Sequence, residues 1–200
     1  MKMITVNRLA AVRSTSQSGF SLIEVIVATS LLILAVASLA QLFVISVRAN
    51  ASARATTYAS VLAQQKMEQL RGLTWGFDPL GLPLTDTTTD VSVTPERATA
   101  GRGLSPSPSG AGTLGVNTDG YCDFLDGSGR WLAGGATVPP GTIFVRRWSV
   151  EPLPTNPHNT IVLQVLVVRH RARVAADAGI GEARTPDEAR LVSVKTRKAS

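Results

Sequence analysis

The sequence is organised around one apolar stretch, residues 19–47, which reads GFSLIEVIVATSLLILAVASLAQLFVISV. After Phe20 the stretch is almost wholly apolar, and Glu24 carries its only charge. A helix needs roughly 20 apolar residues to cross the hydrocarbon of a bilayer, so this stretch is long enough to span a membrane. A carboxylate inside a span costs about 2.5–3.5 kcal/mol on insertion scales. Glu24 therefore either reaches up to the headgroups or has an electrostatic partner or a functional role.

The residues before this stretch are basic. Residues 1–19 contain Lys2, Arg8 and Arg13 and no acidic residue. An excess of Lys and Arg before a span predicts that this end stays in the cytoplasm and that the rest of the chain is exported. An ordinary secretory signal has a shorter apolar core that is followed by a small-residue cleavage site. Here Gly19 precedes the apolar run, so cleavage after Gly19 would remove the basic leader and keep the apolar helix.

The segment from Gly19 to Glu24, GFSLIE, closely resembles the processing site of type IV prepilins and of type II secretion pseudopilins. The resemblance implies that a prepilin peptidase cleaves between Gly19 and Phe20, removes residues 1–19 as a leader and methylates the new amine of Phe20. That amine lies four residues from Glu24, too close on one helix for a good contact but well placed for a neighbouring subunit. An ion pair in low dielectric is strong, although desolvation offsets part of the gain. We therefore expect Phe20 and Glu24 to set the register between assembling subunits.

Residues 48–73, RANASARATTYASVLAQQKMEQLRGL, are predicted to continue the helix. They contain no proline, Gly72 is their only glycine, and most of the others are good helix formers. The helix would then have an apolar half, 20–47, and an amphipathic half, 48–73, before the turn-rich residues 75–79 end it. One face of the second half is predicted to pack on a head domain, and it consists of Tyr58, Val61, Leu62, Met67, Leu70 and Leu73. The solvent face is predicted to hold Arg48, Arg54, Lys66, Glu68 and Arg71.

Residues 74–120 are predicted to be the least regular part of the chain. From Asp78 to Gly120 the sequence is rich in Thr, Pro, Ser and Gly, which favours irregular structure. The stretch looks like the variable loop that joins the helix to the sheet in pilins, and a disordered insertion is the alternative. The run 117–120, with Asp123 and Asp126 nearby, lacks the alternating oxygen ligands and the closing Glu of an EF-hand. We therefore expect turns there rather than a calcium site.

Residues 121–200 are predicted to form a small β-sheet head. The predicted strands are Tyr121–Leu125, Arg130–Leu132, Thr142–Glu151, Thr160–Arg171 and Arg190–Thr196. The first two would form a hairpin around residues 126–129, and the last two would pair across a loop at 175–188. Three or more strands can bury one face against the amphipathic half of the helix. The predicted fold class is α+β, in the form that the resemblance implies: the type IV pilin fold, a long helix at about 20–73 packed on an antiparallel sheet.

Two further features indicate which group of pilins the chain resembles most. The order Arg147-Trp148-Ser149-Val150, then a long apolar strand, then a basic strand, is similar to the V-type minor pilins of the pilus-modification group. Within this order Trp148 is expected to be a core anchor rather than a binding residue. Cys122 is the only cysteine, so it cannot close an internal disulfide. Many major pilins close a loop with a cysteine pair, and the lone cysteine therefore favours a minor pilin.

The sequence predicts no catalytic, cofactor-binding or metal site. His158 and His170 are the only histidines, and neither lies at metal-ligand spacing with Cys122. Without a placed base, Cys122 is expected to be an inert buried thiol. The glycines of the segment 101–103 lack the strand and helix that flank a phosphate-binding loop. We therefore expect a structural protein rather than an enzyme.

The basic charge of the chain gives little support for nucleic-acid binding. The formal net charge is +6, and removal of the leader with its three basic residues would lower it to +3. Nine basic residues late in the chain could contact phosphates, namely Arg146, Arg147, Arg169, Arg171, Arg173, Arg190, Lys195, Arg197 and Lys198. We favour the alternative that they are solubilising charges at a sheet edge and in a tail.

Together these features favour a minor pilin that acts in the assembly of a type IV pilus, at initiation or at the tip. The resemblance implies a single-pass protein of the bacterial inner membrane, with its C-terminus in the periplasm until it enters the filament. The implied partners are the membrane, other pilins or pseudopilins, prepilin peptidase and an inner-membrane assembly platform. A minor pseudopilin of type II secretion is the first alternative. A DNA-uptake or adhesion module is the second.

Overall fold

The computed structural model describes residues 19–108, 112–170 and 188–197. Within them the chain forms one long helix and seven strands, so the predicted α+β architecture is confirmed. The chain divides into two compact units, Met1–Val47 and Arg48–Ser200, and the helix continues from one unit into the other. Nearly all of the predicted leader, residues 1–18, lies outside the described residues.

Helix α1 comprises Leu22–Gly72, close to the predicted range of about 20–73. No proline interrupts it, and alanine, leucine and other good helix formers occupy most positions after Val47. The helix ends at Gly72, because glycine is a poor helix former and tolerates the backbone change that follows. Arg71 lies in the last turn, where a positive charge suits the C-terminal end of the helix dipole.

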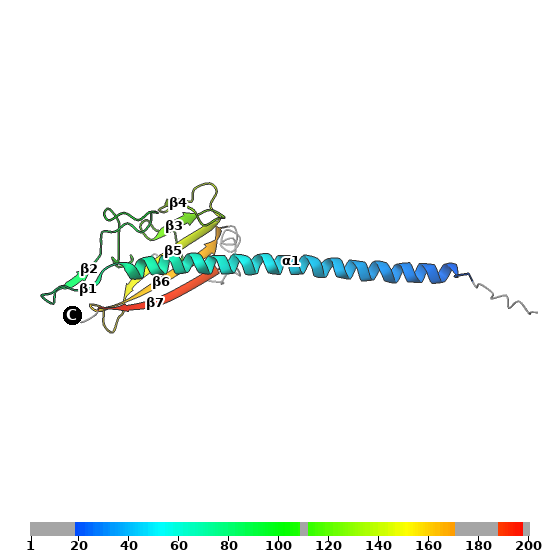
Figure 1. The fold of residues 1–200 in the computed structure, drawn as a ribbon, viewed down its shortest axis with the longest axis horizontal. Coiled ribbons are helices and arrows are strands. Elements are labelled where there is room, and N and C mark those ends of the chain that lie inside the picture. Colours follow the sequence, from blue (N-terminus) through cyan, green and yellow to red (C-terminus); the bar gives the residue numbers. More distant parts are fainter. Residues whose placement is uncertain (1–18, 109–111, 171–187, 198–200) are drawn as a thin grey trace, which may run out of the picture. The chain divides into compact units, whose positions relative to one another are not determined.

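Five antiparallel strands form the main sheet, in the order β4-β3-β5-β6-β7 (Figure 1). Their bounds are Cys122–Leu125 for β3, Trp131–Gly134 for β4, Phe144–Pro152 for β5, Thr160–Arg169 for β6 and Glu188–Thr196 for β7. The predicted β3–β4 hairpin is confirmed, with Phe124 opposite Ala133. The predicted pairing of the last two strands is also confirmed, and β6 lies between β5 and β7, since Val165 pairs with Trp148 on one side and with Leu191 on the other. Most of the predicted 175–188 loop lies outside the described residues.

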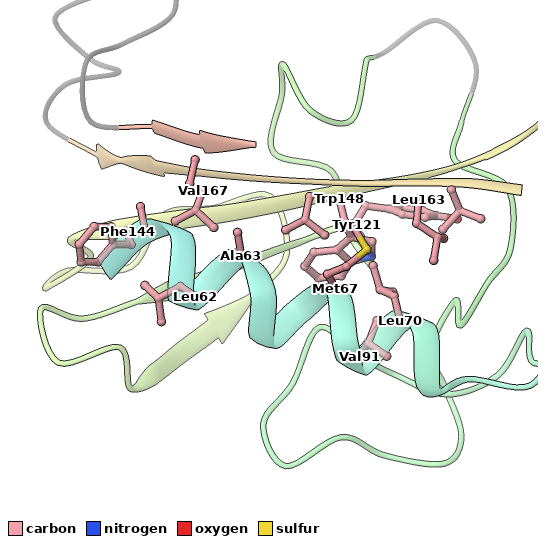
Figure 2. Packing of buried hydrophobic residues seen from close by; sticks show 14 of the residues in the cluster. Leu62, Ala63, Met67, Leu70, Val91, Tyr121, Phe144, Trp148, Leu163 and Val167 are labelled. Atoms are coloured by element: carbon pink, nitrogen blue, oxygen red, sulfur yellow. The ribbon is translucent and has the colours of Figure 1, made fainter. Parts of the chain in front are cut away.

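The second half of α1 packs on one face of this sheet (Figure 1). Its buried residues are Ala59, Leu62, Ala63, Lys66, Met67 and Leu70. Figure 2 shows Ala63 and Met67 on the side of the helix that faces the sheet, and both belong to the same buried cluster as Trp148, Leu163 and Val167. Trp148 is completely buried, which confirms the prediction that it is a core anchor. Removal of this apolar area from water, at about 25 cal/mol per Å², holds the helix against the sheet.

Two helix residues lie on a different face from the predicted one. Val61 was predicted to pack on the head but is 45% exposed, and Lys66 was predicted to face solvent but is 1% exposed. The buried stripe starts at Ala59 and continues at helical spacing, and it leaves Val61 to one side. Lys66 can be buried because the carboxylate of Asp123 lies 2.9 Å from its ammonium.

Residues 75–85 form a hairpin where the sequence predicted only turns. Strand β1 is Trp75–Phe77 and β2 is Pro83–Thr85, and the two pair antiparallel. In the connecting loop the carboxylate of Asp78 accepts the N–H groups of Leu80 at 2.9 Å and Leu82 at 2.7 Å. Gly81 adopts a φ of 78°, which few other residues adopt without strain. The turn at residues 78–82 agrees with the predicted turn-rich sequence. The strands were not predicted, because three residues are too few to show the alternation of apolar and polar residues that indicates a strand.

Residues 86–108 contribute to the core, so the alternative of a disordered insertion is wrong for them. Val91 and Leu104 belong to the main buried cluster. Asp90 and Arg97 form an isolated β-bridge, and the indole N–H of Trp131 donates to the carbonyl oxygen of Ser92 at 2.8 Å. The segment is irregular, as predicted, but it covers one side of the core.

Asp123 and Asp126, near the run 117–120 where turns were predicted rather than a calcium site, both form hydrogen bonds that stabilise the head. The carboxylate of Asp126 accepts the N–H groups of Ser128 at 2.8 Å and Arg130 at 2.9 Å, and so organises the β3–β4 turn. Asp123 lies in β3, where its carboxylate is bound by Arg146. Within the residues described, no three His, Cys, Asp or Glu side chains are grouped as metal ligands would be.

Candidate functional site

The predicted processing residues lie immediately before the first turn of α1. Gly19 and Phe20 are non-helical and exposed, and Phe20 is 82% accessible. The helix starts after Ser21, whose carbonyl oxygen accepts the N–H groups of Glu24 at 3.0 Å and Val25 at 3.2 Å. The peptide bond between Gly19 and Phe20 is therefore outside the helical hydrogen-bond pattern, in backbone that an enzyme could bind without unwinding a helix.

The fold itself does not require a glycine at position 19. A Cβ atom built on Gly19 meets no heavy atom within 4 Å, and its φ is not in the left-handed region. Gly101 is a contrasting case, because a Cβ there would lie 2.1 Å from the Cα of Asp90. If position 19 needs a small residue, the reason must lie in something that binds the chain.

Glu24 lies in the first turn of α1, at the third helical position. A carboxylate there interacts favourably with the positive end of the helix dipole, by about 0.3–1 kcal/mol when exposed. Ser21 and Glu24 also have the Ser-x-x-Glu spacing of a capping box. This local role at the start of the helix was not part of the prediction that Glu24 is an assembly residue. Among the described residues Glu24 has no ion-pair partner, so the structure places Phe20 and Glu24 near each other in the chain without joining them.

The first half of α1 buries none of its apolar surface. Every residue in the range 20–47 is exposed, including a leucine, isoleucine, valine or phenylalanine at most positions. A helix that forms the core of a soluble protein has the same composition but is mostly buried, which this one is not. By length and composition α1 could cross a membrane once. An apolar helix without intramolecular partners needs lipid or other helices around it.

Three hydroxyl groups within the apolar half donate to carbonyl oxygens of the helix itself. Thr29 donates to the carbonyl oxygen of Val25 at 2.8 Å, Ser30 to that of Ile26 at 2.8 Å and Ser38 to that of Leu34 at 2.8 Å. Such bonds from i to i−4 remove the cost of placing a hydroxyl in hydrocarbon. Glu24 is therefore the only charged side chain in this half and the one that still needs a partner in an apolar environment.

Most of the late basic residues that the structure describes bind other parts of the head. Arg146 and Arg147 are each 5% exposed, and Arg147 binds the side chain of Asn117 at 2.8 Å. Lys195 donates to the carbonyl oxygens of Arg71 and Leu73 at the end of α1. Arg171, Arg173 and Lys198 lie outside the described residues. Arg146 and Arg147 are therefore too deeply buried to contact a phosphate backbone.

Cys122 is buried in a second apolar cluster, with Phe124, Val145, Leu166 and Val168. Burial raises the pKa of its thiol to about 12. A thiol with that pKa stays protonated at neutral pH and is a poor nucleophile.

Comparison of this chain with protein-family models, with curated proteins and with solved structures finds no match in any of the three. The site is therefore defined by its residues and geometry alone.

Proposed function

We propose that this chain is a membrane-anchored subunit of a type IV pilus, a minor pilin that acts in assembly or at the tip. Residues 22–47 carry this proposal, because they form a helix that is exposed and almost wholly apolar and that begins two residues after the Gly19–Phe20 bond. A bilayer before assembly and the packed core of a filament afterwards would each cover this surface. Subunits that add head to tail through different surfaces build an open filament rather than a closed ring.

In this proposal Glu24 is the assembly residue. Cleavage after Gly19 creates a cationic amine on Phe20, and the amine of one subunit pairs with the Glu24 carboxylate of its neighbour. The pair forms where water is scarce, so its attraction is large and a misaligned subunit leaves a charge uncompensated. Phe20 and Glu24 thereby select one register between adjacent helices.

A minor pseudopilin of type II secretion would use the same helix and the same processing. The two assignments differ in the machinery encoded beside the gene, a secretion channel or a retractable pilus. A DNA-uptake module is disfavoured by the internal contacts of Arg146, Arg147 and Lys195. Salt-dependent DNA binding by the chain, lost on Arg-to-Ala changes on one face, would revive that assignment.

The first test is the mass of the mature N-terminus in cells that contain prepilin peptidase. We expect a chain that begins at Phe20 and carries a methyl group on its amine. Gly19→Arg should keep the leader, whereas Gly19→Ala should be processed at least in part. Position 19 is exposed and precedes the helix, and a Cβ there meets no heavy atom within 4 Å, so neither substitution is expected to disturb the packing of the head. A native chain that stays intact from Met1 would contradict the proposal.

The second test separates processing from assembly. Glu24→Val should insert in the membrane and be processed normally, because it removes a charge from the span, but it should enter filaments poorly. Glu68→Val is the matched control, since it makes the same change on the exposed face of the second half of α1. Immunoblots of membrane and sheared-filament fractions would measure incorporation. Undiminished incorporation of Glu24→Val would remove the pairing role.

A further inference from the structure

The loop of the β1–β2 hairpin, with the first residues of β2, forms an exposed apolar tip. This apolar tip, residues 79–84, reads PLGLPL and contains no polar side chain. Leu80 is 84% exposed, Leu82 59% and Leu84 44%. The hairpin follows the C-terminal end of α1 and lies beside the end of β7 (Figure 1). Single exposed apolar side chains are common, but several gathered in one place mark a surface that binds a protein or a membrane.

The backbone N–H groups of the apolar tip already have acceptors. Its two prolines have no N–H group. The N–H groups of Leu80 and Leu82 donate to the carboxylate of Asp78 at 2.9 Å and 2.7 Å. The N–H group of Gly81 donates to the carbonyl oxygen of Asp78 at 3.0 Å. The loop 79–83 can therefore leave water without the cost of burying an unpaired donor.

The chemistry of the apolar tip favours lipid over a protein partner. A protein interface carries about one hydrogen bond per 100–200 Å² and is anchored most often by tryptophan, tyrosine or arginine, whereas leucine is under-represented among anchors. The tip has none of these anchors, and its loop uses its N–H donors internally. Hydrocarbon requires no hydrogen bonds, and leucine side chains enter it favourably. The apolar layer of a bilayer is thus the environment that fits the tip.

Two cations lie at the base of the hairpin. The ammonium of Lys195 donates to the carbonyl oxygen of Arg71 at 2.6 Å, and the guanidinium of Arg197 donates to a carbonyl oxygen of β1 at 2.8 Å. Among the described residues neither cation has an ion-pair partner. An apolar insertion with cations behind it suits a membrane surface that carries anionic headgroups. The acidic side chains nearby in the chain already have partners within the head, and they are Glu68, Asp78 and Asp86.

We propose that the apolar tip is a second membrane-binding site, which inserts its three leucines among the acyl chains of a bilayer while Lys195 and Arg197 face anionic headgroups. The hairpin follows the C-terminal end of α1, whereas the residues that could span a membrane form its N-terminal half. The two membrane contacts thus belong to opposite ends of one helix. The second contact is made by the head alone and does not depend on removal of the leader or on filament assembly.

The test uses the full chain, held by its apolar helix in nanodiscs of phosphatidylcholine. These nanodiscs are mixed with separate vesicles of phosphatidylcholine and phosphatidylglycerol, and the protein that sediments with the vesicles is measured against empty nanodiscs. We expect the wild type to bind, and to bind vesicles of phosphatidylcholine alone several-fold more weakly. Leu80→Ser with Leu82→Ser should lower binding about tenfold or more, because it removes most of the inserted apolar area. Equal binding to the two kinds of vesicle would overturn the role of the cations.

Val192→Ser with Val194→Ser is the matched control. Both valines are 60% exposed on β7, so this variant loses exposed apolar area outside the tip and should bind as the wild type does. Near-UV circular dichroism would show that the head of each variant is folded. The proposal is overturned if the wild type does not sediment with the vesicles or if the leucine variant binds equally well. It is also overturned if nanodiscs that carry the wild type associate with one another through the tip, since the partner would then be a second copy of the chain.

Discussion

Asp123 is the residue on which the interior electrostatics of the head depend. Its carboxylate is fully buried between Lys66 and Arg146, and it accepts hydrogen bonds from both. A buried ion pair contributes little net stability compared with apolar residues, but loss of one partner leaves an uncompensated charge. The cost of a substitution here should therefore be set by the charges that remain.

We predict that Asp123→Asn lowers the free energy of unfolding by about 3–5 kcal/mol, because it leaves two cations in the interior without an anion. Chemical denaturation of the full chain in detergent, followed by tryptophan fluorescence, would measure the loss. Adding Lys66→Met should recover part of it, since only one buried cation then remains. Asp126→Asn, in the exposed β3–β4 turn, is the control. Equal losses in the two single variants would contradict this account.

Cys122 gives the head a dependence on alkaline pH. The pKa of its thiol is raised from about 9 to about 12 by burial, so the unfolded chain loses this proton first. The protonated buried thiol contributes its full stabilisation below pH 9, and this contribution is lost as the pH rises through 12. By pH 10.5 the free energy of unfolding has fallen by about 2 kcal/mol. Lys66 acts in the opposite direction, because its lowered pKa makes stability rise between about pH 8 and 10.5.

We therefore predict that wild type loses about 2 kcal/mol more stability than Cys122→Ala between pH 8 and pH 10.5. The titration of Lys66 and of all other groups is common to the two chains and cancels in the comparison. Denaturation curves at several pH values would give the slope of the free energy of unfolding against pH for each of the two chains. Parallel slopes would mean that the thiol is not protected from ionisation.

At the scale of the elements, the β1–β2 hairpin is bound by the side chain of Arg197, directly after β7, in addition to the packing of Trp75 on the core. The guanidinium of Arg197 stacks 3.7 Å from the centre of the Trp75 ring and donates to the carbonyl oxygen of Gly76 at 2.8 Å. It also donates to the hydroxyl of Thr85 at 2.6 Å, so both strands of the hairpin are bound. A two-stranded hairpin is marginal by itself and needs such support.

We predict that Arg197→Ala increases hydrogen exchange in residues 75–85 and leaves exchange in β5 and β6 unchanged. The interactions that this substitution removes are partly exposed and each contributes on the order of 1 kcal/mol or less, so local opening is expected rather than global unfolding. Arg130→Ala is the control, because Arg130 is an exposed arginine in another turn. Exchange that rises throughout the sheet would instead make Arg197 part of the core.

The elements that could be predicted from the sequence are those with a strong local pattern. The long helix follows from its apolar run and helix formers, and β6 follows from its nearly continuous valine, leucine and isoleucine. Strand β7 follows from its alternating pattern, and β5 from β-branched and aromatic residues in a segment bounded by prolines. The burial of Lys66 could not be predicted, because its partner Asp123 is distant in sequence and charged helix residues normally face solvent. Strand β1 depends on Arg197, which is equally distant. The candidate site at Gly19, Phe20 and Glu24 rests on the sequence motif and stays a prediction, and the capping spacing of Ser21 and Glu24 was not part of it.

At the scale of the whole molecule, the two compact units differ in whether their apolar side chains are buried. The unit Arg48–Ser200 buries its apolar side chains in a core of its own, whereas the described part of Met1–Val47 leaves all of them exposed. Among the described residues, the fully buried core of the head begins at Ala59, with Tyr58 packed against it. The stability of the head should therefore be independent of residues 20–47, and insertion across a membrane should depend on them entirely.

We predict that a fragment starting at Arg48 is soluble without detergent and unfolds cooperatively, with the same denaturation midpoint as the head within the full chain. In detergent phase separation the full chain should enter the detergent-rich phase and the fragment should stay in water, because about 20 or more exposed apolar residues favour hydrocarbon strongly. Leu32→Arg with Leu34→Arg in the full chain is the control, since two charges in the span should reduce partition without changing the midpoint. A fragment that aggregates or loses its cooperative transition would show that the head needs the first half of the helix to fold, and the apolar half would then have a structural role within the subunit as well as outside it.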